Sequence, residues 1–323
     1  MVTLQALIPV LDVKALAADC LKFTHPPSSG NGVHMIVEAT NRDLGSPAQF
    51  VCAANLRVTV EGTAFAYRDL GPRDGVPLVL LNHWGAVLDN FDPRIVDGLA
   101  STRRIIATDY RGIGASGGNA PLTVGEMAND AIAVIRALGF KKVDLLGFSL
   151  GGFVAQDIAM KAPELVRKLI LTGTGPASGQ GIDKVWSVSW PLMLKGLVTL
   201  RDPKFYLFFT ATANGRKAAK DFIYRLKERD KDRDKNPTPV SFMRQLKAIR
   251  SWGRQQPQDL SRIQIPTLIV NGDNDIMVPT VNSAELANRI SNSQLIIYPD
   301  AGHGGIFQYH SDFVTRATAF LNA

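Results

Sequence analysis

The sequence is poor in cysteine and contains no long hydrophobic run. Its two cysteines, Cys20 and Cys52, are too few for a disulfide framework or a metal cluster. No apolar run approaches the roughly 18 residues that a membrane-spanning helix needs. No phosphate-binding glycine loop or metal-ligand cluster is recognisable either. We therefore expect no membrane span, no metal and no cofactor.

Charge of one sign is not concentrated anywhere in the chain. The net charge is +7 over 323 residues, of which 46% are hydrophobic and 20% charged, as in ordinary globular proteins. The densest charged stretch, residues 225–235, alternates in sign and predicts a solvated helix face. Nucleic-acid binding would need a patch of one sign with a supporting motif. We expect a small-molecule substrate and no nucleic-acid partner, and the sequence does not indicate an oligomeric state.

The first 49 residues do not resemble the rest of the chain. A short apolar stretch at 4–21 is followed by the breaker cluster THPPSSGNG. Asp12 and Asp19, and the lack of a basic start, argue against a signal peptide, so we expect a cytoplasmic location. We interpret residues 1–49 as an N-terminal arm of uncertain order and expect residues 1–48 to be dispensable for chemistry. A partner-binding helix and a wrongly chosen start remain alternatives.

Short apolar runs alternate with helical patterns from residue 50 onward. Runs that are apolar on both faces suit strands buried between two helix layers of a parallel sheet. A hairpin is expected around Glu61-Gly62, and Thr123 with Glu126 forms a capping box for a helix that Gly139 ends. The sequence predicts an α/β fold, with helices on both faces of a mostly parallel sheet. The expected strands are 57–60, 63–68, 78–82, 104–109, 142–147, 168–173, 267–272 and 294–299.

About 90 residues without a strand pattern separate the runs at 168–173 and 267–272. They contain helical patterns at 186–197, 202–212, 215–229 and 240–252. A helical insertion after a central strand is expected to cover the carboxyl edge of the sheet, where ligands bind in open α/β sheets. We expect a core of residues 50–175 and 260–323 with a helical cap of residues 176–259.

The strongest chemical signal is Gly147-Phe148-Ser149-Leu150-Gly151, which lies between a buried strand and a helix. This G-x-S-x-G pattern needs glycines so that the chain can double back and lift the serine hydroxyl clear of the backbone. The following helix start favours developing negative charge. Ser149 is therefore our candidate nucleophile, against the alternative of an ordinary turn built from small residues.

A serine nucleophile needs a base, and the base needs an orienting acid. Of five histidines, His303 follows a strand in a glycine-rich loop and is our candidate base, whereas His310 is expected to begin the last helix at the surface. The acid should lie between serine and histidine along the chain. Asp273 and Asp275 both follow a strand. We expect Asp275 to be the acid and Asp273 to form the turn.

From about residue 50 to its end, the chain resembles the α/β-hydrolase superfamily, in particular its haloperoxidase-like and esterase-like capped enzymes. The resemblance is carried in order by DYRGIGAS at 109–116, GFSLGG, IPTLIVNGDND and PDAGHGG. It implies an oxyanion hole formed by the amides of Trp84 and Leu150. Relatives mostly have His-Gly where this chain has Asn82-His83, so the local turn must differ.

The resemblance implies a serine hydrolase acting through a Ser-His-Asp triad, because dehalogenases and epoxide hydrolases of this fold carry an aspartate at the elbow. We expect a carboxylic ester hydrolase for small-to-medium apolar acyl groups. Perhydrolysis of the haloperoxidase type, carbon–carbon bond hydrolysis and a non-catalytic receptor remain alternatives. Candidate pocket residues are His83, Phe148, Trp186 and Trp190, although the loop and the core could also explain them.

Overall fold

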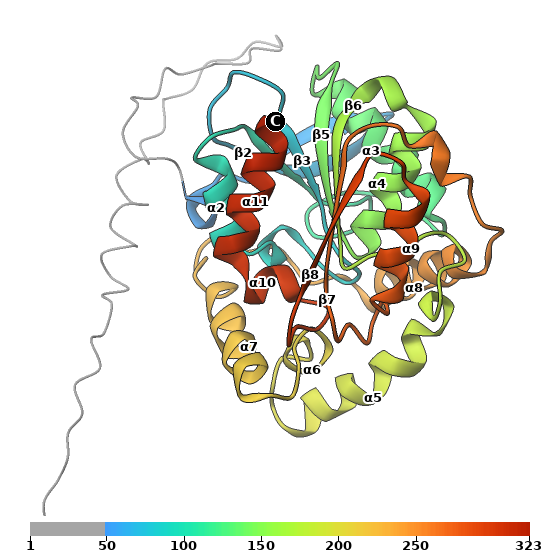
Figure 1. Ribbon diagram of the computed structural model, residues 1–323. Helices are drawn as coiled ribbons and strands as arrows, with labels where there is room; N and C mark the ends of the chain where they lie inside the picture. Colours follow the sequence, from blue (N-terminus) through green and yellow to red (C-terminus); the bar gives the residue numbers. More distant parts are fainter. Residues whose placement is uncertain (1–48) are drawn as a thin grey trace, which may run out of the picture. The chain divides into compact units, whose positions relative to one another are not determined.

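The computed structural model describes residues 49–323, so the arm predicted for residues 1–49 lies almost entirely outside the described residues (Figure 1). The described chain is built on one eight-stranded sheet with the strand order β1-β2-β4-β3-β5-β6-β7-β8. β1 and β2 pair antiparallel, as do β2 and β4, and every other pairing is parallel. The strands are β1 (Leu56–Val60), β2 (Thr63–Leu70), β3 (Leu78–Leu81), β4 (Ile105–Thr108), β5 (Val143–Phe148), β6 (Val166–Thr172), β7 (Thr267–Gly272) and β8 (Ser293–Tyr298).

The strands form where the apolar runs predicted them, and their burial follows their place in the sheet. β3, β4, β5 and β7 are buried throughout, because helix layers cover both of their faces. The hairpin between β1 and β2 turns at Glu61 and Gly62, both with positive φ, as a two-residue hairpin turn requires. β8 lies at an edge of the sheet and leaves Leu295 and Ile297 exposed. The expectation that this apolar run is buried on both faces is therefore wrong for β8.

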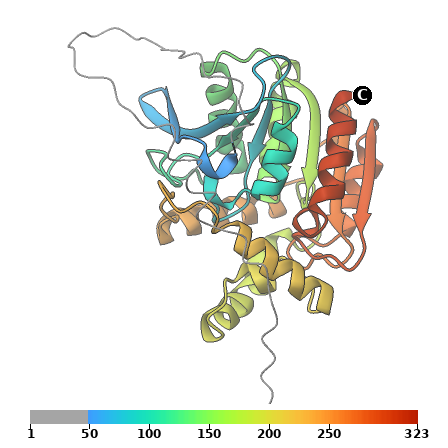
Figure 2. The same ribbon diagram turned by 90° about the vertical axis from the view of Figure 1, so that its left-hand side faces the viewer.

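Helices cover both faces of this sheet. α2 and α11 pack together on one face, whereas α3, α4 and α9 lie on the other (Figures 1 and 2). The predicted capping box of α3 is present, since the Thr123 hydroxyl and the Glu126 carboxylate each accept the other residue's amide, and Gly139 follows with a φ of +82°. The bounds are α2 (Pro93–Ala100), α3 (Val124–Ala137), α4 (Leu150–Lys161), α9 (Val281–Arg289), α10 (Gly305–Gln308) and α11 (His310–Asn322).

The segment between β6 and β7 is helical, as its sequence predicts. α5, α6 and α7 lie together beyond one end of the sheet (Figures 1 and 2). The pattern at 202–212 yields only a four-residue helix, after which Phe208 and Phe209 leave the helix and are buried. The bounds are α5 (Val185–Val198), α6 (Lys204–Leu207), α7 (Ala213–Arg225) and α8 (Pro239–Arg254). Short 3-10 helices complete the described chain at η1 (Phe50–Cys52), η2 (Leu88–Asn90), η3 (Pro163–Leu165), η4 (Ile182–Lys184) and η5 (Leu260–Arg262).

The expectation of a solvated helix face at residues 225–235 holds only in part, because six of these eleven residues are exposed but the helix does not extend beyond Arg225. α7 ends at Arg225, and the side chains of Arg225, Arg229 and Asp234 are buried. Asp234 pairs with the fully buried Arg68 at 3.1 Å, and Arg229 donates to the carbonyls of residues 51 and 53 at 2.9 Å. These three side chains are held by charges and carbonyls that lie far away in the sequence, so the local pattern cannot reveal their burial.

One of these pairs gives a stability prediction. Arg225 holds Asp92 through two charge-assisted hydrogen bonds of 2.9 and 2.6 Å, and both side chains are buried. Arg225→Met would leave the Asp92 carboxylate buried without a positive partner and with only the Arg94 amide as a donor, which costs about 3–5 kcal/mol. Urea unfolding should show this loss, whereas Lys217→Met, which breaks the exposed pair with Asp221 on the same helix, should cost less than about 1 kcal/mol. Equal losses in the two variants would contradict the prediction.

Candidate active site

Ser149 stands on a strained turn between β5 and α4. Its φ of +57° and ψ of −116° are unusual for a residue other than glycine and mark backbone strain that the surroundings must hold in place. The Ser149 amide donates to the Thr172 carbonyl at 2.9 Å, and the Ser149 carbonyl accepts from Gly152 and the Thr174 hydroxyl. The Ser149 hydroxyl makes no hydrogen bond within residues 49–323, so it contributes no hydrogen bond to the stability of the fold.

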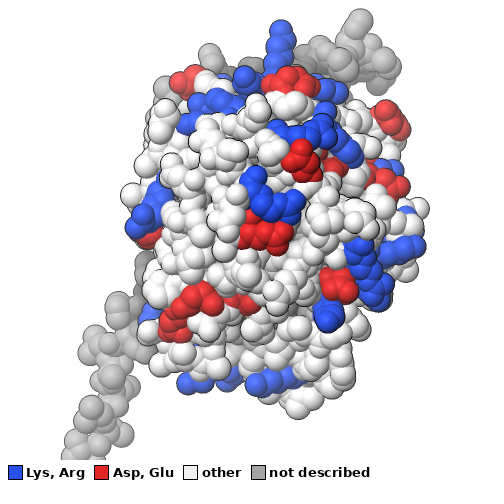
Figure 3. Space-filling view, turned by 45° about the vertical axis from the view of Figure 1, so that its right-hand side comes forward, with Lys and Arg blue, Asp and Glu red and all other residues white. Residues whose placement is uncertain are grey.

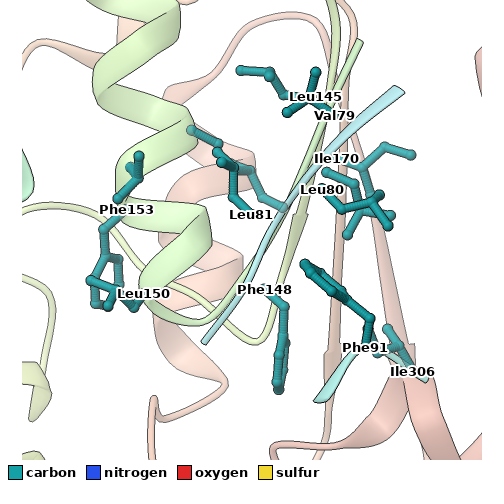
Figure 4. Packing of buried hydrophobic residues seen from close by; sticks show 14 of the residues in the cluster. Val79, Leu80, Leu81, Phe91, Leu145, Phe148, Leu150, Phe153, Ile170 and Ile306 are labelled. Carbon is teal, nitrogen blue, oxygen red and sulfur yellow. The ribbon is translucent and has the colours of Figure 1, made fainter. Parts of the chain in front are cut away.

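The glycines beside Ser149 are required by close backbone approach. A Cβ at Gly147 would overlap the Gly151 carbonyl oxygen, and a Cβ at Gly151 would overlap the carbonyl oxygen of Leu81 at the end of β3. Figure 4 shows the side chains of Phe148 and Leu150, which flank Ser149 in the sequence, together with those of Leu81 and Phe153. The turn is therefore pressed against the end of the neighbouring strand, which explains why the G-x-S-x-G pattern has side-chain-free positions where it does.

His303 and Asp275 come together from the loops after β8 and β7. The His303 Nδ1 atom donates to Asp275 Oδ2 at 2.8 Å, and both side chains are almost fully buried. The other carboxylate oxygen, Oδ1, accepts the amides of Met277 at 2.8 Å and Val278 at 3.0 Å. Both oxygens of the Asp275 carboxylate are thus held by hydrogen bonds. Because His303 Nδ1 carries the proton, the imidazole is in the tautomer whose Nε2 can accept a proton.

Asp273 has a different part in the same region. Its carboxylate accepts the amides of Asp300 and Ala301, both at 3.1 Å, and the Asn274 side-chain amide at 2.6 Å. It therefore ties the turn after β7 to the loop that leads to His303. The structure places Asp275 against His303 and Asp273 in the turn, which is the arrangement expected from the sequence.

Ser149 and His303 line a single cavity of about 200 Å³. No hydrogen bond joins the Ser149 hydroxyl to His303 among the described residues. In unliganded sites such contacts are often long and tighten only when the substrate binds. The cavity walls are mainly apolar and are contributed by Ile182, Val185, Met193, Pro203, Leu207, Ile249, Met277, Val278 and several aromatic residues.

The loop after β3 brings Trp84 to the wall of the same cavity. Neither the Trp84 amide nor the Leu150 amide has a hydrogen-bond acceptor within the described chain. α8 fixes this loop, because the Trp84 indole donates to the Phe242 carbonyl at 2.9 Å and stacks on the Phe242 ring. Gln245 also accepts the Gly85 amide at 2.9 Å. Sequence reasoning missed these roles of α8, since nothing local distinguishes Phe242 and Gln245 from other helix residues.

The cavity lining differs from the expected set of pocket residues. Only His83 of the four candidates lines the cavity. Phe148 is buried behind it, with its ring 4.9 Å from that of His303, and Trp186 packs edge-on against Trp84. Trp190 is 48% exposed. Helix α5 presents Met193 to the cavity instead, and α6 and α8 present Leu207, Phe242 and Ile249, because the faces of these helices are set by tertiary packing.

The loop at residues 109–116, DYRGIGAS, contacts the elements that surround the site. Arg111 forms a two-bonded ion pair with Asp130, and the Ser116 hydroxyl accepts the Ala66 amide of β2 at 2.9 Å. The Gly112 carbonyl accepts the Ser241 hydroxyl of α8 at 2.8 Å. Burial raises the pKa of Asp109 well above its ordinary value. This loop therefore contacts β2 and α8, and none of its residues lines the cavity.

Other kinds of site receive no support from the described residues. Residues 49–323 contain no group of three or more His, Cys, Asp or Glu side chains that could hold a metal ion. No helix in this range is long and apolar enough to cross a membrane. Positive and negative side chains lie interspersed on the face seen in Figure 3, so this face does not offer the one-sign patch that nucleic acid needs.

The chain is similar in sequence to a known protein family and to characterised proteins. Residues 76–308 match the model of the alpha/beta hydrolase fold family. Proline iminopeptidase PfmaB of Pestalotiopsis fici is 30% identical over 274 residues, covering 76% of this chain and 92% of that protein. Human serine hydrolase BPHL is 26% identical over 269 residues, covering 82% of this chain and 85% of that protein.

A solved structure agrees with the described chain over most of its length. The alpha/beta hydrolase fold protein from Chitinophaga pinensis superposes with a TM-score of 0.80 at 35% identity. The match covers 85% of this chain and 100% of that chain.

Proposed function

Because the chain belongs to the alpha/beta hydrolase fold family, we propose that it is a serine hydrolase with Ser149 as its nucleophile. The observation that carries the proposal is the 2.8 Å pair of Asp275 and His303, because His303 lines the same cavity as the strained Ser149. The names of two relatives, an iminopeptidase and a serine hydrolase, support the reaction class.

The proposed reaction follows from the positions of these groups. Ser149 Oγ attacks the acyl carbon, and His303 Nε2 takes the hydroxyl proton. The charge that develops on the carbonyl oxygen is stabilised by the amides of Trp84 and Leu150, a contribution of roughly 3–4 kcal/mol per donor in known sites. The C–O bond to the leaving alcohol then breaks, His303 returns the proton to it, and water hydrolyses the acyl-enzyme by the same steps.

The proposed substrate is an ester with a small-to-medium apolar acyl group. The cavity of about 200 Å³ is somewhat larger than an apolar cavity of about 150 Å³ that accommodates benzene. Its two charged lining residues, Asp202 and Lys204, pair with each other at 3.0 Å. A charged acyl group would lose its hydration without gaining a free partner, which is costly.

A panel of p-nitrophenyl esters tests the proposal. We expect kcat/KM to rise with acyl length to a maximum at about four to eight carbons and to fall for longer chains, as the cavity fills. The hemisuccinyl ester should be at least tenfold slower than the butanoyl ester. A fluorophosphonate probe should label the parent but not Ser149→Ala. Absence of labelling and of turnover would instead favour a non-catalytic receptor, and peracid formation measured in parallel would favour perhydrolysis.

The division of the chain belongs to the same proposal. We propose that residues 50–175 and 260–323 form the catalytic core and that residues 176–259 form a cap, which is supported by the contributions of α5, α6 and α8 to the cavity wall. The cytoplasmic location expected from the sequence stays a prediction, which cell fractionation would test.

A further inference from the structure

Helix α5 and the turn after it expose an apolar surface, which we call the α5 patch. Its five residues are Trp190 and Leu194, each about half exposed, and Leu197, Val198 and Leu200, which are 72%, 75% and 93% exposed. The four residues within the helix follow the i, i+4, i+7, i+8 spacing, so their side chains share one helix face. Single exposed apolar residues are common on folded proteins, whereas a set gathered on one face marks an interaction surface.

Leu200 occupies the position at which a helix usually ends in glycine. α5 closes with a Schellman motif, in which the Leu200 amide donates to the Leu197 carbonyl at 3.2 Å and the Arg201 amide donates to the Gly196 carbonyl at 2.9 Å. This motif gives Leu200 a φ of +53°, which is unstrained only for glycine. Because the Leu200 side chain is almost fully exposed, packing within the described chain does not offset that strain. A strained and exposed leucine suggests a role outside the fold.

The charges beside the α5 patch are all positive. Residues 184–201 contain three basic residues and no acidic one. The basic residues are Lys184, Lys195 and Arg201, all of them exposed. The acidic residues just outside this range, Asp183 and Asp202, already pair with Arg254 and Lys204. The patch is therefore flanked by cations whose charge no neighbouring carboxylate in the sequence is left to balance.

An apolar helix face that carries a tryptophan and is flanked by cations matches the surface of an anionic lipid layer. Aliphatic side chains enter such a layer, tryptophan suits its interface, and lysine and arginine reach its phosphate groups. A second copy of the chain fits less well. A twofold contact would place the patch on itself and bring its cations together without an acidic partner.

We propose that the α5 patch docks the protein on an anionic lipid layer, with its apolar side chains inserted and its three flanking cations beside the phosphate groups. α5 has 14 residues, fewer than the about 20 needed for a span, so the helix lies on the layer and does not cross it. Met193 of the same helix and Pro203 line the cavity, so docking brings the cavity wall close to the lipid. The docking itself does not depend on the proposed reaction of Ser149.

Co-flotation of the full-length protein with vesicles tests this inference. One set of vesicles is pure phosphatidylcholine, and the other contains about one third phosphatidylglycerol, which is anionic. We expect binding to the anionic vesicles and at least about tenfold weaker binding to the neutral ones. Binding to the anionic vesicles should weaken as salt is raised, because salt screens the attraction between the cations and the phosphate groups.

Substitutions separate the apolar and the charged contributions. Leu200→Gly removes the exposed side chain and supplies the residue that a Schellman motif prefers, so its thermal midpoint should equal or exceed that of the parent. Its affinity for the anionic vesicles should fall at least about fivefold. Lys195→Gln should lower this affinity by about fivefold through the lost charge. Leu295→Gln on β8 and Lys142→Gln before β5 are matched controls at exposed positions, and both should bind as the parent does.

Three results would overturn the inference. The first is a parent that does not bind the anionic vesicles; a dimer that Leu200→Gly dissociates, measured by light scattering, would then assign the patch to a second copy. The second is parent-like binding by both Leu200→Gly and Lys195→Gln, since the lipid would then be bound elsewhere. The third is equal binding to neutral and anionic vesicles, which would contradict the choice of anionic lipid. Ser149→Ala should bind vesicles as the parent does, so this inference and the proposed function fail separately.

Discussion

Ser149→Ala is expected to lower kcat by about 10⁴-fold or more while leaving the fold intact. The hydroxyl makes no hydrogen bond within residues 49–323, whereas the backbone contacts of Ser149 with Thr172, Gly152 and Thr174 do not depend on the side chain. Alanine at a φ of +57° carries the same kind of strain as serine. The substitution therefore removes the proposed attacking atom and little else.

The measurement is steady-state turnover of p-nitrophenyl butanoate, with circular dichroism and thermal unfolding to establish that the variant is folded. Ser178→Ala provides a matched control, because Ser178 is another serine with a positive φ, of +60°, but is exposed and does not line the cavity. It should keep at least half of the parent activity. Turnover of Ser149→Ala within tenfold of the parent would remove Ser149 from the mechanism.

The strands and the serine turn could be predicted from the sequence because their causes are local. A run that is apolar on both faces, such as Thr267–Gly272, has few options besides a buried strand, and it occupies those residues in the structure. The glycines at 147 and 151 belong to a pattern of only five residues, and the tight turn at Ser149 requires them. The capping box at Thr123 and the turn at Gly62 likewise depend on near neighbours.

The contact of Asp275 with His303 was predictable for a different reason. Asp273 and Asp275 follow the same strand, and what separates them is which way each side chain turns. The tight turn that Asp273 forms with Asn274 and the loop at 300–301 uses up its oxygens, and this leaves Asp275 to face His303. An Asp directly after a strand-ending glycine is a common turn former, so the sequence predicts that Asp273 forms the turn. Asp275 is then the carboxylate that remains to face His303.

The cavity wall could not be predicted, because it depends on which face of each helix meets the core. α5 is apolar around most of its circumference, so the sequence does not say whether Trp190 or Met193 points inward. The contact between α8 and the loop after β3 joins residues about 160 apart, and only the folded chain brings Trp84 onto Phe242. The burial of Arg225 and Asp234 has the same origin, since their partners Asp92 and Arg68 lie 133 and 166 residues away in the sequence.

The second large effect is expected for Asp275→Asn, which should lower kcat/KM by about 10³- to 10⁴-fold. The reason is the way in which this carboxylate is held. One oxygen accepts the amides of Met277 and Val278, so the asparagine carbonyl oxygen is expected to take that place. The asparagine NH₂ group then faces His303 Nδ1 and donates to it. The imidazole proton would move to Nε2, where it blocks acceptance of the Ser149 proton.

The opposite orientation of the asparagine side chain would place NH₂ against two backbone N–H donors and is therefore disfavoured. Asp273→Asn is the matched control, because the one asparagine oxygen can still accept one of the two loop amides, and its activity should stay within about tenfold of the parent with a lower thermal stability. Both variants are compared by kcat/KM for p-nitrophenyl butanoate and by the rate of fluorophosphonate labelling. A larger loss in Asp273→Asn than in Asp275→Asn would show that the carboxylates have been assigned the wrong way round.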